Sequence, residues 1–443
     1  MSAKSALSRR YALKVGATAL LVSGMAPAVI SCRAKAQQKT LRILRWKHFV
    51  PGYDTWFNET FIKEWGDAND TEVIVDNVGL GEIGKIAAEE AKLGKGHDLV
   101  LFLAPPPSLE DHVIDHREIF EECEQRYGKA IEFARRGSYN PRTDKYYGVC
   151  ESYAPTVLSY RKDLWDAVGE QPDSWDDIRK GGRKIKLLHE KSVGLSLAPE
   201  HNSKHSVRAI LYAFGGAIQD ADGNPALKSG QTLEAVKFAK ALYEEAMTDD
   251  TLTWDPPANN RFILSEEGCL TIDTLSIPRA AESKSLPVDA NLALARLPEG
   301  PAGRIGPNFG AYTYAIWQFA ENMESAKQFL VDYVGHSETA LTASGFQNMP
   351  SFPAHVPGLG DLLKNDPVRP ERYAVLADVA ETMTNLGQPG YANAATDEVL
   401  RSGIISTLFA KAATGQLSPE DALDEADKAI LPIFEKWKGV GKI

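Results

Sequence analysis

The sequence predicts an α/β protein with a parallel sheet near its beginning. Apolar segments at 41–46, 72–76 and 98–103 are predicted strands, and the segments 55–65 and 81–93 between them are predicted helices. Strands that alternate with helices in this order are typical of parallel α/β units.

Each of these elements has its own signal. The first helix carries large apolar residues on one broad face, at Trp56, Phe57, Phe61, Ile62 and Trp65. The second helix has apolar residues in helical register, and Gly94 follows it as a terminator. The run 98–103 is continuously apolar, as expected of a strand that is covered on both faces.

Further α/β material follows. Strands are predicted at 156–160, 269–272 and 312–316, and helices at 206–214 and 232–247. The segment 175–185 is mixed and polar and is assigned to neither class. From Asp378 the chain is predicted to be mostly helical, and Ser418-Pro419 is a strong helix start because Ser caps and Pro suits the first turn.

The carboxyl ends of the first three strands predict the position of a ligand site. Ligands of open α/β sheets bind outside these ends. The loops concerned are 46–48, 77–80 and 104–107, and we expect them to meet at one edge of the sheet. The three prolines at 105–107 remove backbone donors and predict a ligand edge that is more apolar or differently shaped.

Composition limits the protein's class. The chain has 443 residues, which favours two or three domains, and its 43% apolar and 25% charged residues are globular values. A net charge of −11 argues against nucleic acid as a partner. Four cysteines are too few for a disulfide-built fold, and Cys123, Cys150 and Cys269 are expected to be buried thiols, or one disulfide with one thiol left over.

Residues 1–36 predict an export signal. Arg9-Arg10 precede an apolar run from Val15 to Ile30, which resembles the twin-arginine export signal and is short for a membrane-spanning helix. Cleavage is expected either before Cys32, which would make a lipoprotein, or after Ala36. We therefore expect an exported protein, periplasmic or anchored by lipid.

The sequence contains no convincing motif for a cofactor, a metal or a catalytic centre. The glycines of 79–84 match dinucleotide-binding spacing but follow the second strand and lack the acidic residue at a later strand end. His112 and His116 lie one helical turn apart without evident further ligands. There is no Gly-x-Ser-x-Gly elbow, and we expect no cofactor, no metal and no catalytic residue.

Several segments resemble extracytoplasmic solute-binding proteins of carbohydrate ABC importers (family 1). The most specific is Phe214-Gly215-Gly216-Ala217-Ile218-Gln219-Asp220-Ala221-Asp222-Gly223-Asn224-Pro225. Others in chain order are 46–54, 94–100, 147–164, 254–262, 297–310 and 418–423. His97 and Cys150 stand where the family usually has proline.

The resemblance implies a two-lobed periplasmic-binding-protein fold with a hinge between the lobes. The chain would cross near 152–156, 305–311 and 350–356. The implied N-terminal lobe comprises 38–152 plus about 309–352, and the C-terminal lobe comprises 153–308 plus about 353–443. Hinge closure is a known switching mode, and the closed form would be recognised by the membrane permease subunits of the importer.

The resemblance also implies a non-enzymatic carbohydrate receptor, expected to be a monomer, for a monosaccharide, an oligosaccharide or a glycosylated polyol. Aromatic rings cover the apolar face of a sugar, and polar groups read its hydroxyls. Candidate ligand-binding residues are Trp46, His48, Asp54, Glu151, Tyr153, Trp254, Asn259, Asn308, Phe309, Gly310, Gln347 and Tyr391. Trp46 is the first choice for a stacking ring, and Trp46→Ala is expected to weaken sugar binding without unfolding the protein.

Two alternatives stay open. The same fold could bind a charged solute that is not a sugar. An arginine cluster at the site would favour an anion, whereas the loops named above carry only Lys47. The less favoured alternative is an exported glycosidase or lyase, because paired carboxylates of a glycosidase are recognised only in space.

Overall fold

A six-stranded sheet organises the first part of the chain. The structure, a computed structural model, describes residues 39–104 and 106–443. The sheet order is β13-β6-β12-β3-β1-β2. The strands are β1 (Lys39–Trp46), β2 (Thr71–Val78), β3 (Leu99–Phe102), β6 (Val149–Ala154), β12 (Gly310–Ile316) and β13 (Met349–Pro350).

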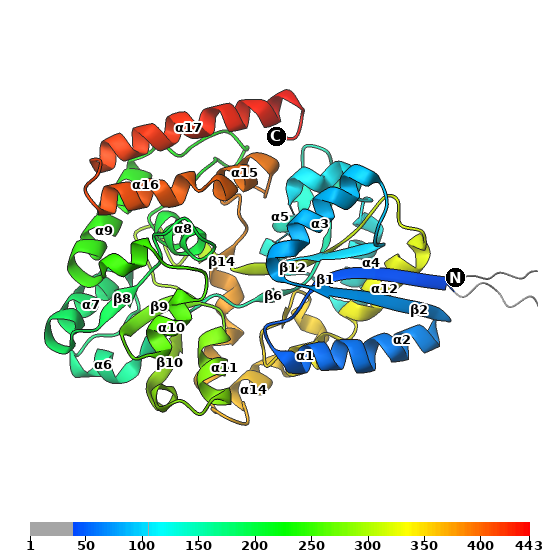
Figure 1. Cartoon of the computed structure of the whole chain (residues 1–443), viewed down its shortest axis with the longest axis horizontal. Helices are drawn as coiled ribbons and strands as arrows, with labels where there is room; N and C mark the ends of the chain where they lie inside the picture. Colours follow the sequence, from blue (N-terminus) through cyan, green and yellow to red (C-terminus); the bar gives the residue numbers. More distant parts are fainter. Residues whose placement is uncertain (1–38, 105) are drawn as a thin grey trace, which may run out of the picture. The chain divides into compact units, whose positions relative to one another are not determined.

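The predicted parallel unit is confirmed. β1 pairs in parallel with β2 and with β3, whereas β12 runs antiparallel to β3 and β6. Figure 1 shows α3 (Leu80–Leu93) on one face of this sheet and α1 (Pro51–Thr55) and α2 (Ile62–Ala68) on the other, with one π-helical turn, Trp56–Phe61, joining α1 to α2. β1 is covered on both faces, because successive strand side chains point to opposite faces and Ile43, Leu44 and Trp46 are all fully buried.

Four further helices belong to the lobe that is built on the six-stranded sheet. They are α4 (Arg117–Tyr127), α5 (Glu132–Ser138), α12 (Met323–Val334) and α13 (Ser337–Ala343). A two-stranded ribbon, β4 (Tyr139–Asn140) with β5 (Lys145–Tyr146), and the short 3-10 helix η2 (Pro107–His112) complete it.

A second sheet of four strands has the order β10-β7-β9-β8. Its strands are β7 (Val157–Arg161), β8 (Ser192–Gly194), β9 (Gly268–Asp273) and β10 (Leu292–Ala295). The helices of the intervening and C-terminal segments are α6 (Lys162–Ala167), α7 (Trp175–His189), α8 (Ser203–Ala213), α9 (Gly230–Ala246), α10 (Ala258–Leu264), α11 (Ser276–Ser283), α14 (Leu359–Lys364), α15 (Ala394–Ser402), α16 (Ile404–Ala413) and α17 (Pro419–Gly439). The architecture is therefore a mixed α/β fold of two lobes, one on each sheet.

The chain passes from the first sheet to the second and back. β6 ends at Ala154 in the first sheet, and β7 begins at Val157 in the second. The return passes β11 (Gly306–Pro307), which pairs with β14 (Met383–Thr384), and enters β12. The lobe boundaries and the hinge stay predictions.

Three details extend or revise the expected elements. The unassigned segment 175–185 is the helix α7, whose N-cap Ser174 accepts a hydrogen bond from the backbone of Asp177 at 3.1 Å. The region after Asp378 is less helical than expected, because short 3-10 turns and a loop precede α15. The helix start at Ser418 is confirmed, since its hydroxyl accepts from the backbone N–H of Asp421 at 3.0 Å.

Cys123, Cys150 and Cys269 are buried free thiols, as the first of the two expectations stated. In the part of the chain that the structure describes, no helix combines the length and apolar content needed to cross a bilayer. The export signal expected over 1–36, Cys32 included, lies outside the described residues.

Candidate functional site

A cavity of about 820 Å³ lies at the carboxyl ends of the first three strands. Phe49 follows β1, Leu80 and Gly81 follow β2 and open α3, and Ala104 and Pro106 follow β3; all five line the cavity. The prediction that these three loops meet at one sheet edge is confirmed. After β3 the lining is formed by Ala104 and Pro106, and Ser108 follows.

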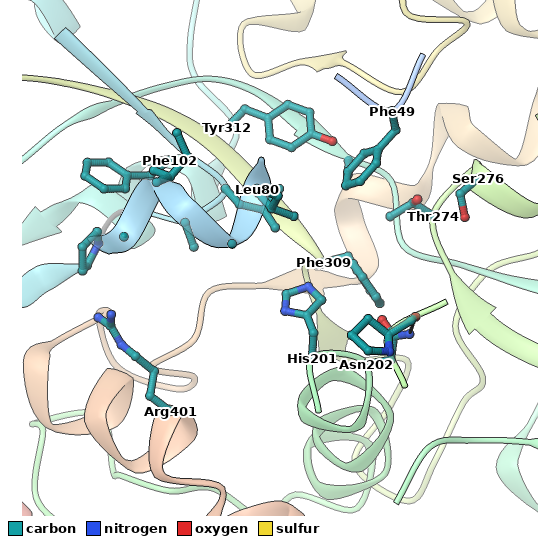
Figure 2. Close-up of a pocket in the computed structure, with 18 of the residues that line it drawn as sticks. Phe49, Leu80, Phe102, His201, Asn202, Thr274, Ser276, Phe309, Tyr312 and Arg401 are labelled. Carbon is teal, nitrogen blue, oxygen red and sulfur yellow. Dashed lines mark hydrogen bonds between the residues drawn. The ribbon is translucent and has the colours of Figure 1, made fainter. Parts of the chain in front are cut away.

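An exposed aromatic ring stands at this cavity. Phe49 is 53% exposed although its ring centroid lies only 5.0 Å from that of Trp46. Trp46 is fully buried, and its ring also packs against Tyr312 at 5.4 Å, which itself lines the cavity. Figure 2 shows Phe49 and Tyr312 on the same side of the cavity. Trp46 therefore supports the lining rings from behind.

Phe309 supplies a third lining ring from the segment that enters β12. It stacks on His205 of α8 with ring centroids 3.9 Å apart, and the edge of His201 approaches it at 5.4 Å. Burial, together with the nearby charge of Arg208, holds the pKa of His205 well below its usual value, so this imidazole is neutral at pH 7. Phe309 was among the predicted site residues, and the structure places it in the lining.

A hydrogen-bonded polar group lines another part of the cavity, at the end of β9 and the start of α11. Asp273 accepts from the backbone N–H of Thr274 at 2.7 Å and from the hydroxyl of Ser276 at 2.8 Å. The amide of Asn260 donates to the Ser276 hydroxyl at 2.7 Å. Burial raises the pKa of Asp273 above its ordinary value. Oxygen and nitrogen atoms with fixed positions of this kind suit the hydroxyls of a polar ligand.

Asn259 lies behind this group and is 2% exposed. Its amide nitrogen donates to Asp273 at 2.9 Å, and its carbonyl oxygen accepts from the amide of Asn202 at 3.0 Å. Since both partners line the cavity, Asn259 positions two lining residues without being one itself.

Gln347 joins the two lobes at the cavity. Its amide donates to the hydroxyl of Tyr312 at 3.1 Å and to that of Thr274 at 3.3 Å, and all three residues line the cavity. Gln347 was a predicted site residue.

Two predicted residues of the first loop face inward. The Nε2 of His48 lies 2.8 Å from the amide oxygen of Asn348, and burial lowers the pKa of His48 to about 4. Asp54 accepts from the backbone N–H of His48 at 2.9 Å and pairs with Arg45 at 3.1 Å. Both side chains organise the loop that presents Phe49, and neither lines the cavity.

The other predicted residues also lie outside the lining. Glu151 is buried in β6, where burial raises its pKa to about 8. Tyr153 packs edge-on against Phe133 at 5.1 Å, and Trp254 packs on Phe262 at 5.2 Å.

The last three predicted residues, Asn308, Gly310 and Tyr391, do not line the cavity either. The backbone N–H of Asn308 donates to Thr384 at 3.0 Å. Gly310 lies so close to Leu103 that a Cβ there would approach the Cδ1 of Leu103 at 2.9 Å. The ring of Tyr391 lies under the guanidinium of Arg136 at 5.1 Å.

Sequence reasoning missed several lining residues. Phe49 is the neighbour of a chosen residue, and Asp273 and Thr274 directly follow a predicted strand, so the strand-end rule could have found them. His201, Asn202 and Arg401 gave no local signal. Among residues 39–104 and 106–443 no cluster of His, Cys, Asp or Glu is arranged to hold a metal ion.

Comparison with known proteins finds a family model that matches part of the chain. Residues 122–335, a little under half of the chain, match the model described as bacterial extracellular solute-binding protein. A binding protein of Brucella abortus (strain 2308) is 26% identical over 192 residues, which are 42% of this chain. The match spans 46% of that relative, so about half its length.

Solved structures of several solute-binding proteins share the fold. An oligosaccharide periplasmic-binding protein from Synechococcus sp. MITs9220, in complex with zinc, superposes with a TM-score of 0.74 at 15% identity, over 89% of this chain and 99% of that one. An ABC transporter solute-binding protein from Thermotoga lettingae TMO, bound to α-D-tagatose, gives 0.70 at 17% identity, over 89% and 100%. This likeness confirms the two-lobed periplasmic-binding-protein fold.

Proposed function

We propose that this protein captures a carbohydrate in the cavity and delivers it to an ABC importer without transforming it. The observation that carries the proposal is that one cavity is lined both by an exposed aromatic ring and by polar side chains in fixed positions that could hydrogen-bond to sugar hydroxyls. Phe49 and Phe309 offer apolar area for a sugar face, and Asp273, Thr274 and Ser276 offer hydrogen bonds.

Two further observations support the proposal. A cavity of about 820 Å³ is in the range of small-ligand sites and has room for more than one sugar ring. Of the two structurally similar proteins named above, one is an oligosaccharide periplasmic-binding protein and the other is bound to α-D-tagatose. Transport by an importer, export of the chain, the monomeric state and closure of the lobes about a hinge belong to the same proposal.

A thermal-shift screen of the full chain, freed of co-purified solute, tests the proposal. The panel contains monosaccharides, disaccharides, longer oligosaccharides, glycosylated polyols, polyamines and amino acids. A ligand at 100 times its Kd stabilises the folded state by about 2.7 kcal/mol, which is readily measured. A rise in melting temperature with one class of saccharides supports a carbohydrate receptor. A rise with polyamines or amino acids alone overturns it. Sugar turnover by the purified protein would overturn the non-enzymatic part.

A further inference from the structure

The cavity has a cationic side. Arg401 of α15 and His201, just before α8, both line it, and Figure 2 shows Arg401 well away from Thr274 and Ser276. Lys204 and Arg208 follow His201 on the same face of α8, because residues three and four apart are neighbours on a helix. Arg401 thus lines one part of the cavity, and Lys204 and Arg208 lie next to His201 just outside the lining. Asp273 lines another part.

Two of these cations have no carboxylate partner. Arg401 pairs with Asp397 on its own helix. Lys204 and Arg208 form no ion pair with any residue of 39–104 and 106–443. Arg208 is only 5% exposed and donates to the carbonyl of Lys204 at 2.8 Å and to Nδ1 of His205 at 3.1 Å, so a buried charge is held by neutral acceptors.

The acid nearest in sequence, Glu200, forms no ion pair with them, although its charge acts to raise the pKa of Lys204. Glu200 directs its carboxylate to the backbone N–H groups of Asn202 at 2.7 Å and Ser203 at 2.8 Å, at the start of α8. Burial and the charges of Arg208 and Arg401 lower the pKa of Lys204. The three cations are therefore close enough to repel one another. A buried or half-buried cation without a partner is costly, and a bound anion would remove that cost.

The wall built by α3 leaves room for a ligand. Gly81 and Gly84 both line the cavity, and a Cβ at either position would meet nothing within 4 Å. They belong to the first turns of α3, where the helix dipole favours negative charge.

We propose that the solute is a saccharide that carries an oxyanion, either a carboxylate or a phosphate, and that Arg401 and Lys204 bind this group while Arg208 supports them from α8. The proposal rests on the carbohydrate function above. Charge-assisted hydrogen bonds are about twice as strong as neutral ones, so the oxyanion would contribute specificity as well as affinity.

The test uses matched pairs of probes on the full chain. Galactose is compared with galacturonate, digalacturonate with its neutral disaccharide, and maltose with maltose 1-phosphate; inorganic phosphate is a fourth probe. Calorimetry is expected to show at least tenfold tighter binding of the charged member in one carboxylate or phosphate pair. In the double variant Lys204→Gln/Arg401→Gln this preference is expected to fall at least tenfold.

A matched variant controls for the loss of two charges. Arg183→Gln/Lys184→Gln removes two exposed cations of α7 and is expected to leave the preference unchanged. Which pair responds distinguishes carboxylate from phosphate.

Each other outcome overturns one or both proposals. Equal or tighter binding of the neutral members, or a preference that persists in the double variant, overturns the oxyanion proposal and leaves the carbohydrate function standing. Stabilisation by inorganic phosphate alone, lost in the double variant, supports the cationic site and overturns the saccharide. Silence with all probes in both proteins overturns both.

Discussion

Phe309 stacks on His205 with their ring centroids 3.9 Å apart and their planes 19° apart. The two residues come from different parts of the chain, one from the segment before β12 and the other from α8. Because the buried imidazole stays neutral, it supports the Phe309 ring by packing and adds no charge next to it. The ring is thereby held in one orientation at the cavity, which lowers the entropy lost when a ligand binds.

Phe49→Ala is expected to weaken the binding of the cognate sugar about tenfold, because the exposed ring is lost from the cavity. The free energy of unfolding should change by less than about 0.5 kcal/mol, since the side chain is 53% exposed. Calorimetry and urea unfolding measure the two effects. Leu187→Ala on α7, where the leucine is 74% exposed, is the control and should change neither quantity. An unchanged affinity in Phe49→Ala would remove this ring from the site.

Trp46→Ala is now expected to destabilise the protein by about 3–5 kcal/mol, because a fully buried indole is removed from the core. This replaces the sequence-based expectation that the variant would bind weakly and stay folded. Urea unfolding monitored by circular dichroism measures the loss, with Phe49→Ala as the matched control. A wild-type midpoint for Trp46→Ala would show that the indole is less buried than described.

Asn259→Ala is expected to lower sugar affinity about tenfold without removing any group from the cavity. The variant frees the side chains of Asn202 and Asp273, which Asn259 holds at 3.0 and 2.9 Å. Asn291→Ala, in the 3-10 helix Pro287–Asn291, is the control. Calorimetry on both variants measures the effect, and equal affinity in both would assign Asn259 a structural role only.

The free energy of unfolding is expected to fall as pH rises, because Glu151 titrates at a higher pH in the folded protein than in the unfolded chain. Its pKa is about 8 in the folded protein and near 4.5 when unfolded, so the folded state holds more protons between these values. From pH 6.5 to 8 the wild type should therefore lose roughly 1 kcal/mol per pH unit relative to Glu151→Gln. Urea unfolding at several pH values measures the difference. Exposed Glu59→Gln should retain the wild-type slope, and a parallel slope in Glu151→Gln would contradict the raised pKa.

The elements of the first parallel unit and several later ones could be predicted because their signals are local. Other helices were not predicted, α4, α7 and α12 among them. In α7, Gly181 and Gly182 occupy the buried face and hide the apolar periodicity. A Cβ at Gly181 would meet the Trp165 ring at 2.3 Å, so the helix packs closely through a residue that no hydrophobic pattern reveals.

By itself, the sequence determined the α/β class, the parallel order of the first unit and the sheet edge at which the cavity lies. Periodicity and strand-end position are properties of neighbouring residues, so they can be recognised before the fold is known. Only the tertiary structure decided which polar and aromatic residues face the cavity. Trp46 and His48 are suitable sugar-binding residue types, but Tyr312 covers Trp46 from 266 residues away and Asn348 covers His48 from 300 residues away. Asp273, Phe309 and Arg401, by contrast, are brought to one cavity by sheet and helix packing. Burial depends on these distant neighbours, and no local pattern contains them.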